Sequence, residues 1–249
     1  MEQIEEIDSD YGTINIFKNR STGALIYELG GCSQSSADGN GTSLASYIHA
    51  IFGLLTQANA RNILLVGGAG GTLGTMLARA RRKATIVDIN PVSFTLARQH
   101  FGLPKTVICH VADGKVFLRS NTDTYDAIVL DAFHGDRIPS HLQSSAFFGL
   151  VRDRLTLRGA VFANVHVKHD FDDYADRVAN TMKNTWKDVR LLDAEGICGR
   201  NAIVMAGRVS HLRAPSLLVP PVTNVDSIDN ELARLRFRAW RVSRWDFAR

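Results

Sequence analysis

Three aspartates stand at or just after the ends of predicted strands: Asp88, Asp113 and Asp131. Upstream of them, residues 63–66 form an apolar run without interruption, which is typical of a strand buried on both faces of a sheet. In open α/β sheets, ligands bind at the carboxyl ends of the strands. The three carboxylates are therefore candidates for one shared binding site.

Two of these acids suit different parts of a nucleoside. A carboxylate at Asp88 can accept hydrogen bonds from both hydroxyls of a ribose, which NAD and S-adenosyl ligands both carry. Asp113, followed by Gly114, can accept a hydrogen bond from an adenine amino group. Each acid also has a plainer interpretation as the N-cap of the helix that follows, so both interpretations stay open.

A glycine cluster, Gly67-Gly68-Ala69-Gly70-Gly71, separates a predicted strand from a predicted helix. Glycines at such a position allow a tight turn, and they let a ligand approach the backbone and the helix N-terminus. The strand–loop–helix context favours ligand binding, and the alternative is a tight turn that binds nothing.

The elements that must position these residues alternate between strands and helices from Asn62 onward, and late strands are predicted near 189–192 and 202–205. This order predicts an α/β fold with a doubly wound, Rossmann-like parallel sheet. Upstream, residues 11–29 predict a hairpin of two short strands, residues 30–41 a small-polar loop and residues 43–55 a helix.

We therefore expect an N-terminal strand domain with a linking helix over 1–52 and a nucleoside-binding domain over 53–249 that ends in a basic helix. The formal charge is +4, but the last eighteen residues alone contain six arginines and one acid. The high charge is thus a property of the tail, and a nucleic-acid-binding body is not indicated. Helical spacing would place Leu232, Leu235, Ala239 and Val242 on one face, with Trp240 and Trp245 docking on the body or a partner; a solvated helix is the alternative.

The rest of the composition bears on where the protein works and on whether it binds a membrane or a metal. Apolar runs are far shorter than the roughly 20 residues of a membrane span, and the first ten residues hold five acids and no base, unlike a secretory leader. Three scattered cysteines indicate neither a disulfide framework nor a metal site. We expect a cytoplasmic protein without a metal and without a membrane partner.

Five segments together resemble the spermidine synthase (aminopropyltransferase) family, in its bacterial spermidine-synthase-like branch. Residues 64–73 resemble the family's glycine-rich loop, and residues 86–90 resemble its acid–isoleucine–acid ribose motif. Asp113-Gly114 is similar to the adenine-side pair, and residues 131–139 are similar to the catalytic loop. Upstream, residues 31–36 and Tyr47 resemble the segment that contributes a glutamine and a tyrosine to the active site.

The resemblance implies a small β-strand domain before a methyltransferase-like Rossmann domain, usually paired as a homodimer. It implies a decarboxylated S-adenosylmethionine or S-adenosylmethionine donor and a small amine acceptor, without a metal. The implied site residues are, for the donor, Gln34, Gly67, Gly68, Gly70, Asp88, Ile89, Asp113 and Gly114; for the acceptor, Tyr47 and Ala69; and for catalysis, Asp131, His134 and Asp136.

The sequence departs from the family where an amine would lie. Ala69 and His134 replace two aspartates of the pattern, and Asn90 replaces a further acid. His134 could act as a base in place of the aspartate or be an ordinary loop histidine. Asp136 could supply the missing carboxylate or simply form a turn, and Tyr47 could be a core residue.

These departures leave several functions open. We expect a transferase with an altered acceptor. The alternatives are a methyltransferase that uses S-adenosylmethionine and a non-catalytic nucleoside-binding homologue. An NAD-dependent oxidoreductase is the least favoured, because the similarity beyond the glycine loop points elsewhere.

Overall fold

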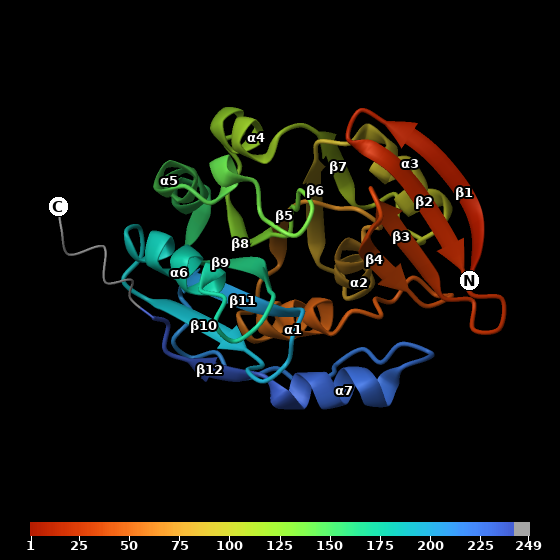
Figure 1. The fold of residues 1–249 in the computed structure, drawn as a ribbon. Helices are drawn as coiled ribbons and strands as arrows, with labels where there is room; N and C mark the ends of the chain where they lie inside the picture. Colours follow the sequence, from red (N-terminus) through yellow and green to blue (C-terminus); the bar gives the residue numbers. More distant parts are fainter. Residues whose placement is uncertain (242–249) are drawn as a thin grey trace.

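The computed structural model describes residues 1–241, which form two β-sheets with helices around the larger one (Figure 1). The smaller sheet is antiparallel and contains the four N-terminal strands in the order β1-β2-β3-β4. Their bounds are β1 (Glu2–Ser9), β2 (Gly12–Lys18), β3 (Leu25–Leu29) and β4 (Cys32–Ala37).

The N-terminal sheet is larger than the predicted hairpin, because β1 and β4 were not expected. β1 reads EQIEEIDS and is mostly exposed, since it is an edge strand whose acids keep other chains from pairing with it. β4 reads CSQSSA and lacks the branched and aromatic residues that mark most strands. The prediction of a loop over 30–41 was therefore wrong.

The larger sheet has the strand order β12-β10-β11-β9-β8-β5-β6-β7. Strands β7, β6, β5, β8 and β9 run parallel, as predicted, while β11, β10 and β12 add an antiparallel edge. The strands are β5 (Asn62–Val66), β6 (Lys83–Asp88), β7 (Ile108–Val111), β8 (Tyr125–Leu130), β9 (Leu155–Val167), β10 (Val189–Asp193), β11 (Arg200–Gly207) and β12 (Arg236–Arg238).

The order in which the chain adds strands to this sheet reverses at β5, although β5 and β8 themselves run parallel. From β5 the chain winds outward through β6 to β7, and it then returns to the other side of β5 to form β8. Such a switch point leaves a crevice between the carboxyl ends of the two neighbouring strands, where ligands bind in folds of this type. The residues that follow β5 and β8 are Gly67 and Asp131.

Helices cover both faces of the larger sheet, so its central strands are buried on both sides. In β5, Ile63 and Leu65 face one core cluster, and Leu64 and Val66 face the other, which explains the uninterrupted apolar run. The helices are α1 (Ser46–Gln57), α2 (Thr72–Arg79), α3 (Pro91–Gln99), α4 (Gly114–Ser120), α5 (Ser145–Asp153), α6 (Tyr174–Lys183) and α7 (Val225–Arg234), with a short 3-10 turn η1 (Ser140–Leu142). None of the helices within 1–241 is long and apolar enough to span a bilayer.

The predicted basic C-terminal helix through Val242 was wrong. α7 ends at Arg234, and the chain then joins the sheet as β12. Leu232 and Leu235 are buried in the core, but Ala239 is exposed, so the helical face does not form. Val242 and Trp245 lie outside the described residues.

Buried acids explain why the chain leaves the helix. The carboxylate of Asp193, which is 2% exposed, accepts hydrogen bonds from Arg200 Nε at 2.6 Å and from Arg238 Nε at 2.9 Å. Arg238 also binds Asp176 through both terminal nitrogens. Burial alone would raise the pKa of Asp193, but the two guanidinium groups outweigh it and hold that pKa below its ordinary value. Beyond β12, Trp240 docks on α6 and donates to Asn180 Oδ1 at 3.0 Å.

We predict that Asp193→Ala lowers the free energy of unfolding by about 3–5 kcal/mol, because it leaves buried guanidinium groups without their partner. Chemical denaturation followed by circular dichroism measures the loss. The matched control is Asp153→Ala, which removes an exposed ion pair with Arg152 and should change stability by less than about 0.5 kcal/mol. Equal effects of the two substitutions would contradict this assignment.

Candidate active site

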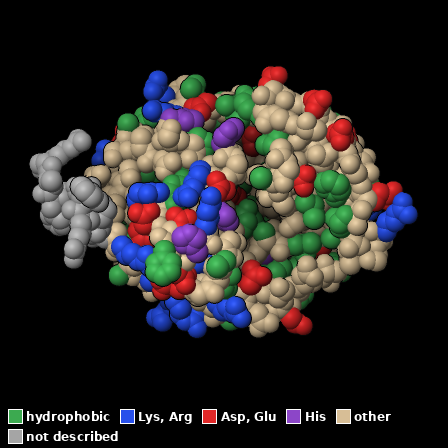
Figure 2. Space-filling model, in the orientation of Figure 1, with side chains coloured by type: hydrophobic (Ala, Val, Ile, Leu, Met, Phe, Trp, Pro, Cys, Tyr) green, Lys and Arg blue, Asp and Glu red, His purple; other side chains and the backbone are tan. Residues whose placement is uncertain are grey.

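A cleft opens at the carboxyl ends of β5, β6 and β8, beside β4 of the N-terminal sheet. It consists of two adjoining pockets of about 400 and 500 Å³, each of a size that holds a small molecule. Gln34, Gly68 and Asp131 line both. Figure 2 shows a hollow near the middle of this face of the molecule.

We name the pockets after one residue in each. The Asp88 pocket extends toward α3 and α4, and its lining includes Ile89, Asp113, Gly114 and His141. The Asn164 pocket extends toward α1, β9 and β11, and its lining includes Tyr47, His166 and Asn201. The two pockets give the cleft chemically different halves.

The glycine loop forms the floor between the halves. A Cβ on Gly67, whose φ is +96°, would lie 2.2 Å from the backbone oxygen of Asp131, so only glycine fits there. A Cβ on Gly68 would lie 2.8 Å from Ile86 and 3.4 Å from Asp88 Oδ2. The absence of side chains at Gly67 and Gly68 thus lets the ends of β8 and β6 pack directly against the loop.

Asp88 fastens this loop. Its Oδ2 accepts hydrogen bonds from the N–H groups of Gly68 at 2.8 Å and Ala69 at 3.4 Å, and its Oδ1 accepts from the N–H of Asn90 at 2.8 Å. Burial raises the pKa of Asp88, and these hydrogen bonds partly offset the rise. The N-cap of α3 is Asn90, so the helix-cap interpretation of Asp88 was wrong, and its carboxylate lines the Asp88 pocket.

Asp113, in contrast, is a helix cap. Its Oδ1 accepts from the N–H groups of Lys115 and Val116 at 2.9 Å each, and its Oδ2 lies 2.7 Å from His141 Nε2. Burial works to raise the pKa of Asp113, but the hydrogen bonds from Val116 and His141 lower it below the ordinary value. Because Asp113 also lines the Asp88 pocket, capping and ligand contact are compatible.

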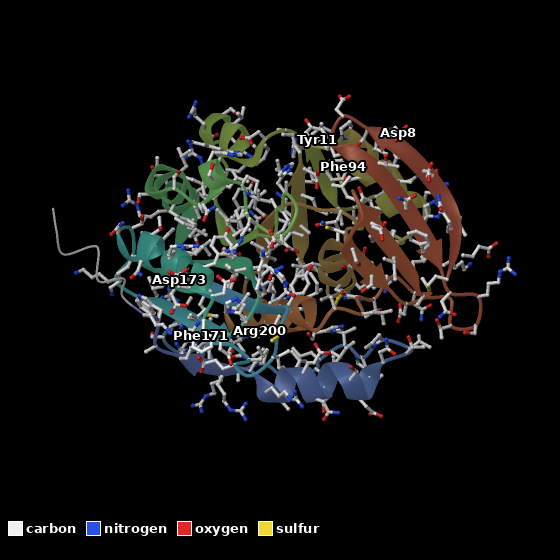
Figure 3. The ribbon with its side chains drawn as sticks, in the orientation of Figure 1. Asp8, Tyr11, Phe94, Phe171, Asp173 and Arg200 are labelled. Atoms are coloured by element: carbon white, nitrogen blue, oxygen red, sulfur yellow. The ribbon has the colours of Figure 1, made fainter. Side chains whose placement is uncertain are left out.

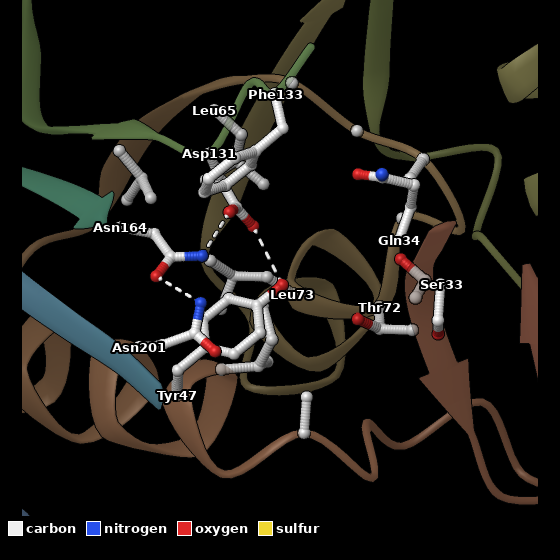
Figure 4. Close-up of a pocket in the computed structure, with 18 of the residues that line it drawn as sticks. Ser33, Gln34, Tyr47, Leu65, Thr72, Leu73, Asp131, Phe133, Asn164 and Asn201 are labelled. Carbon is white, nitrogen blue, oxygen red and sulfur yellow. Dashed lines mark hydrogen bonds between the residues drawn. The ribbon is translucent and has the colours of Figure 1, made fainter. Parts of the chain in front are cut away.

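Asp131 stands where the two pockets meet, and a chain of hydrogen bonds holds its carboxyl group (Figure 4). Asn164 Nδ2 donates to Oδ1 at 2.8 Å, and the Tyr47 hydroxyl donates to Oδ2 at 3.4 Å. Asn201 Nδ2 in turn donates to Asn164 Oδ1 at 2.9 Å. Figure 4 places Gln34 across the pocket from this chain.

The surroundings of Asp131 change its acidity. Burial raises its pKa to about 6, although the hydrogen bonds from Asn164 and Tyr47 work in the opposite direction. Burial, followed by the charge of Asp131, raises the pKa of Tyr47 well above its ordinary value, so the tyrosine is a neutral donor. A carboxyl group with a pKa near 6 is able to accept a proton at neutral pH.

The other predicted residues divide between the two pockets. Ile89 and Gly114 line the Asp88 pocket, Tyr47 lines the Asn164 pocket, and Ala69, with a φ of +39°, lines both. Gly70 lies outside both linings, because its N–H donates to Ser35 Oγ and a Cβ there would collide with Ser35 and Phe101.

The two remaining catalytic candidates, His134 and Asp136, line different pockets. His134 is exposed, lines only the Asp88 pocket and forms a short turn in which its N–H donates to Arg137 O at 2.9 Å. Asp136 lines the Asn164 pocket and pairs with Lys168 Nζ at 2.6 Å. The Lys168 ammonium lowers the pKa of Asp136, so this carboxylate is charged and already paired.

Sequence analysis missed four site residues: His141, Asn164, His166 and Asn201. Asn164 is the one polar residue within the apolar stretch 160–165 of β9, and that interruption was an available signal. His166 and Asn201 lie opposite each other on β9 and β11, and only the pairing register shows that they meet. Within residues 1–241, no three His, Cys, Asp or Glu side chains are placed to hold a metal ion.

Comparison with known proteins gives a consistent family relationship. A model of the spermine/spermidine synthase domain matches residues 46–192. A probable polyamine aminopropyl transferase from Bifidobacterium longum is 31% identical over 114 residues, which cover 45% of this chain and 26% of the relative. A polyamine aminopropyltransferase from Neisseria meningitidis is 33% identical over 129 residues, which cover 48% of each protein. This chain therefore spans about a quarter to a half of the length of these relatives.

Solved structures show the same fold. A probable spermidine synthase from Corynebacterium glutamicum aligns with a TM-score of 0.77 at 19% identity, over 94% of this chain and 90% of that one. Human methyltransferase-like protein 13 in complex with SAH aligns with a TM-score of 0.52 at 20% identity, over 81% and 94%. The predicted methyltransferase-like Rossmann sheet, preceded by a small strand sheet, is thus confirmed.

We predict that the Asp131 carboxyl titrates with a midpoint of about 6 in a carbon-detected NMR titration. The midpoint should rise in Tyr47→Phe, which removes a hydrogen bond to the charged form. Because the folded pKa exceeds the ordinary 3.8, the folded state favours the protonated carboxyl. Wild-type protein should therefore lose about 1–3 kcal/mol of stability relative to Asp131→Asn as the pH rises from 4 to 6.

The matched control is Asp123→Asn, which removes a carboxyl at an exposed position outside the cleft lining. A midpoint near 4 for Asp131 would contradict the burial argument. So would a stability difference from Asp131→Asn that stays constant between pH 4 and pH 6.

Proposed function

This chain belongs to the spermine/spermidine synthase family, and from that membership we propose that it transfers an aminopropyl group from decarboxylated S-adenosylmethionine to an amine. In this proposal the Asp88 pocket holds the donor nucleoside and the Asn164 pocket holds the amine. Residues 1–52 and 53–249 serve as the strand domain and the donor-binding domain of a cytoplasmic homodimer.

The Asp88 pocket supports the donor half of the proposal. The Asp88 carboxylate lines the pocket, and three of its roughly four lone-pair sites accept the N–H groups of the loop and of Asn90. One ribose hydroxyl takes the remaining site, and the second replaces the long 3.4 Å contact from Ala69. Asp113, which lines the same pocket, offers an acceptor for the adenine amino group. Gly114 lets the start of α4 pack closely on β5, since a Cβ there would lie 2.5 Å from Val66, and this contact holds Asp113 at the pocket.

The observation that carries the proposal is the position of Asp131 at the junction of the pockets. A donor seated on Asp88 and Asp113 extends its sulfonium toward the shared lining. The attacking amine, entering from the Asn164 pocket, then forms a bond to the methylene carbon next to sulfur, and the carbon–sulfur bond breaks. Asp131 stabilises the cationic sulfonium and accepts the proton that the amine releases.

Neighbouring residues orient this carboxyl rather than react. Tyr47 and Asn164 donate to its two oxygens, and Asn201 fixes the Asn164 amide. Gln34, which lines both pockets, is placed to contact the thioether or the donor chain. We assign Asp136 to the acceptor side and leave His134 no step in the mechanism, because its imidazole is exposed on the donor side.

Methyl transfer is the second candidate, favoured by Ala69. No carboxylate in the glycine loop is available for the donor's terminal amine, so a donor tail that carries its own carboxylate meets less repulsion. The two reactions differ in the bond that is cleaved, and hence in the thioether released.

We predict that the protein releases methylthioadenosine from decarboxylated S-adenosylmethionine when amines are supplied, and that it forms no S-adenosylhomocysteine from S-adenosylmethionine. Liquid chromatography with mass detection measures both products. Formation of S-adenosylhomocysteine would replace the proposal by methyl transfer. Tight binding of methylthioadenosine without any product would indicate a non-catalytic nucleoside-binding protein.

Substitution of Asp88 tests whether the donor binds in the Asp88 pocket. Asp88→Ala should raise the KM for the donor about tenfold or more, because a charged hydrogen-bond partner of the ribose is lost. Asp88→Asn, which retains one acceptor for the loop N–H groups, should have a smaller effect. Asp123→Ala is the exposed control, and thermal unfolding verifies that each variant is folded.

A further inference from the structure

Resting on the proposed transferase function, we propose that the acceptor is an amine with one positive charge whose far end is a hydroxyl group, an amino alcohol rather than a diamine. The Asn164 pocket recognises the far end by neutral hydrogen bonds. This inference names the substrate class, which the family membership leaves open for this chain.

The wall of the Asn164 pocket is the polar end of an otherwise apolar sheet face. On the face that packs against α1, β8 places Val129 and then Asp131, and β9 places Phe162 and then Asn164. Farther along β9, His166 lies across from Asn201 of β11. The chain therefore changes from apolar to amide and imidazole side chains where the cleft begins.

Carboxylates are scarce in this wall. Among the described residues, the Asn164 pocket is lined by two carboxyl groups, those of Asp131 and Asp136. Asp131 lies at the junction and is engaged by Asn164 and Tyr47, and Asp136 is paired with Lys168. After the reacting nitrogen has taken Asp131 as its partner, a second ammonium meets no unpaired carboxylate.

Neutral hydrogen-bonding groups are left over in the same wall. His166 contributes an imidazole to this wall, although its buried Nδ1 is closed to the cavity. The Asn201 amide uses one N–H on Asn164. The second N–H and the oxygen of Asn201, which lines this pocket, remain for a ligand. A hydroxyl group both donates and accepts, so it can pair with either of them, whereas an ammonium only donates and is costly to bury without a counter-charge.

With this acceptor, the transfer exchanges one carbon–sulfur bond for one carbon–nitrogen bond. The amine nitrogen forms a bond to the methylene carbon of the donor, and the carbon–sulfur bond breaks. The electron pair of that bond goes to sulfur, giving methylthioadenosine. The nitrogen attacks as the neutral amine, after its ammonium proton has passed to the Asp131 carboxylate, and the acceptor hydroxyl is unchanged.

The experiment compares three acceptors of equal carbon length: 4-amino-1-butanol, putrescine and n-butylamine. Each is incubated with the full chain and decarboxylated S-adenosylmethionine, and methylthioadenosine formation gives kcat/KM. We expect the amino alcohol to exceed both others at least about tenfold. Preference for putrescine would overturn the inference while leaving the transferase function intact. Equal use of butylamine would overturn the hydroxyl assignment, and no turnover with any amine would overturn both proposals.

A charge introduced into the wall provides a second test. His166→Glu should shift the ratio of putrescine to amino alcohol use toward putrescine by about tenfold, because it supplies the missing counter-charge. His166→Gln is the neutral control and should keep the wild-type preference. If His166→Glu does not fold, Asn201→Asp tests the same wall. An unchanged ratio in the folded acidic variant would show that this wall does not contact the far end.

Discussion

The close approach of Gly67 to the backbone of Asp131 determines the geometry of the whole cleft. The Asp131 oxygen occupies the place of a Gly67 side chain, and the Asp131 N–H donates to Val66 O at 2.8 Å. β5 and β8 therefore end side by side at the switch point of the sheet. This contact brings the backbone of Asp131 to the wall that the two pockets share, where Asn164 and Tyr47 then hold its carboxyl group.

Asp131 lies between two pockets with different chemistry. On one side, Asp88 and Asp113 present carboxylates that suit a nucleoside. On the other side, amides and an imidazole form a wall with little free negative charge. The carboxyl group between them is partly buried, which raises its pKa, and it is oriented by two donors. The loop that follows β9, which carries Phe171 and Asp173, lies near Arg200 and away from the junction of the two pockets (Figure 3).

The parallel sheet and most of the residues that line the Asp88 pocket together could be predicted from sequence, because they depend on local signals. An uninterrupted apolar run marks β5, and glycines with an acid at the following strand end mark the Asp88 pocket. The lining of the Asn164 pocket depends on the register between strands that are far apart in the chain, such as the pairing of Asn201 with His166. β1 and the arginine-rich β12 were misjudged, because their residues serve as an edge and as partners of buried acids.

The most direct test of this account is a crystal structure with methylthioadenosine bound. The account predicts adenine against Asp113 and Gly114, the ribose hydroxyls on Asp88, and the sulfur directed at Asp131 in the wall that both pockets share. The Asn164 pocket should remain free for an amine. A nucleoside seated in the Asn164 pocket, or a sulfur directed away from Asp131, would contradict it.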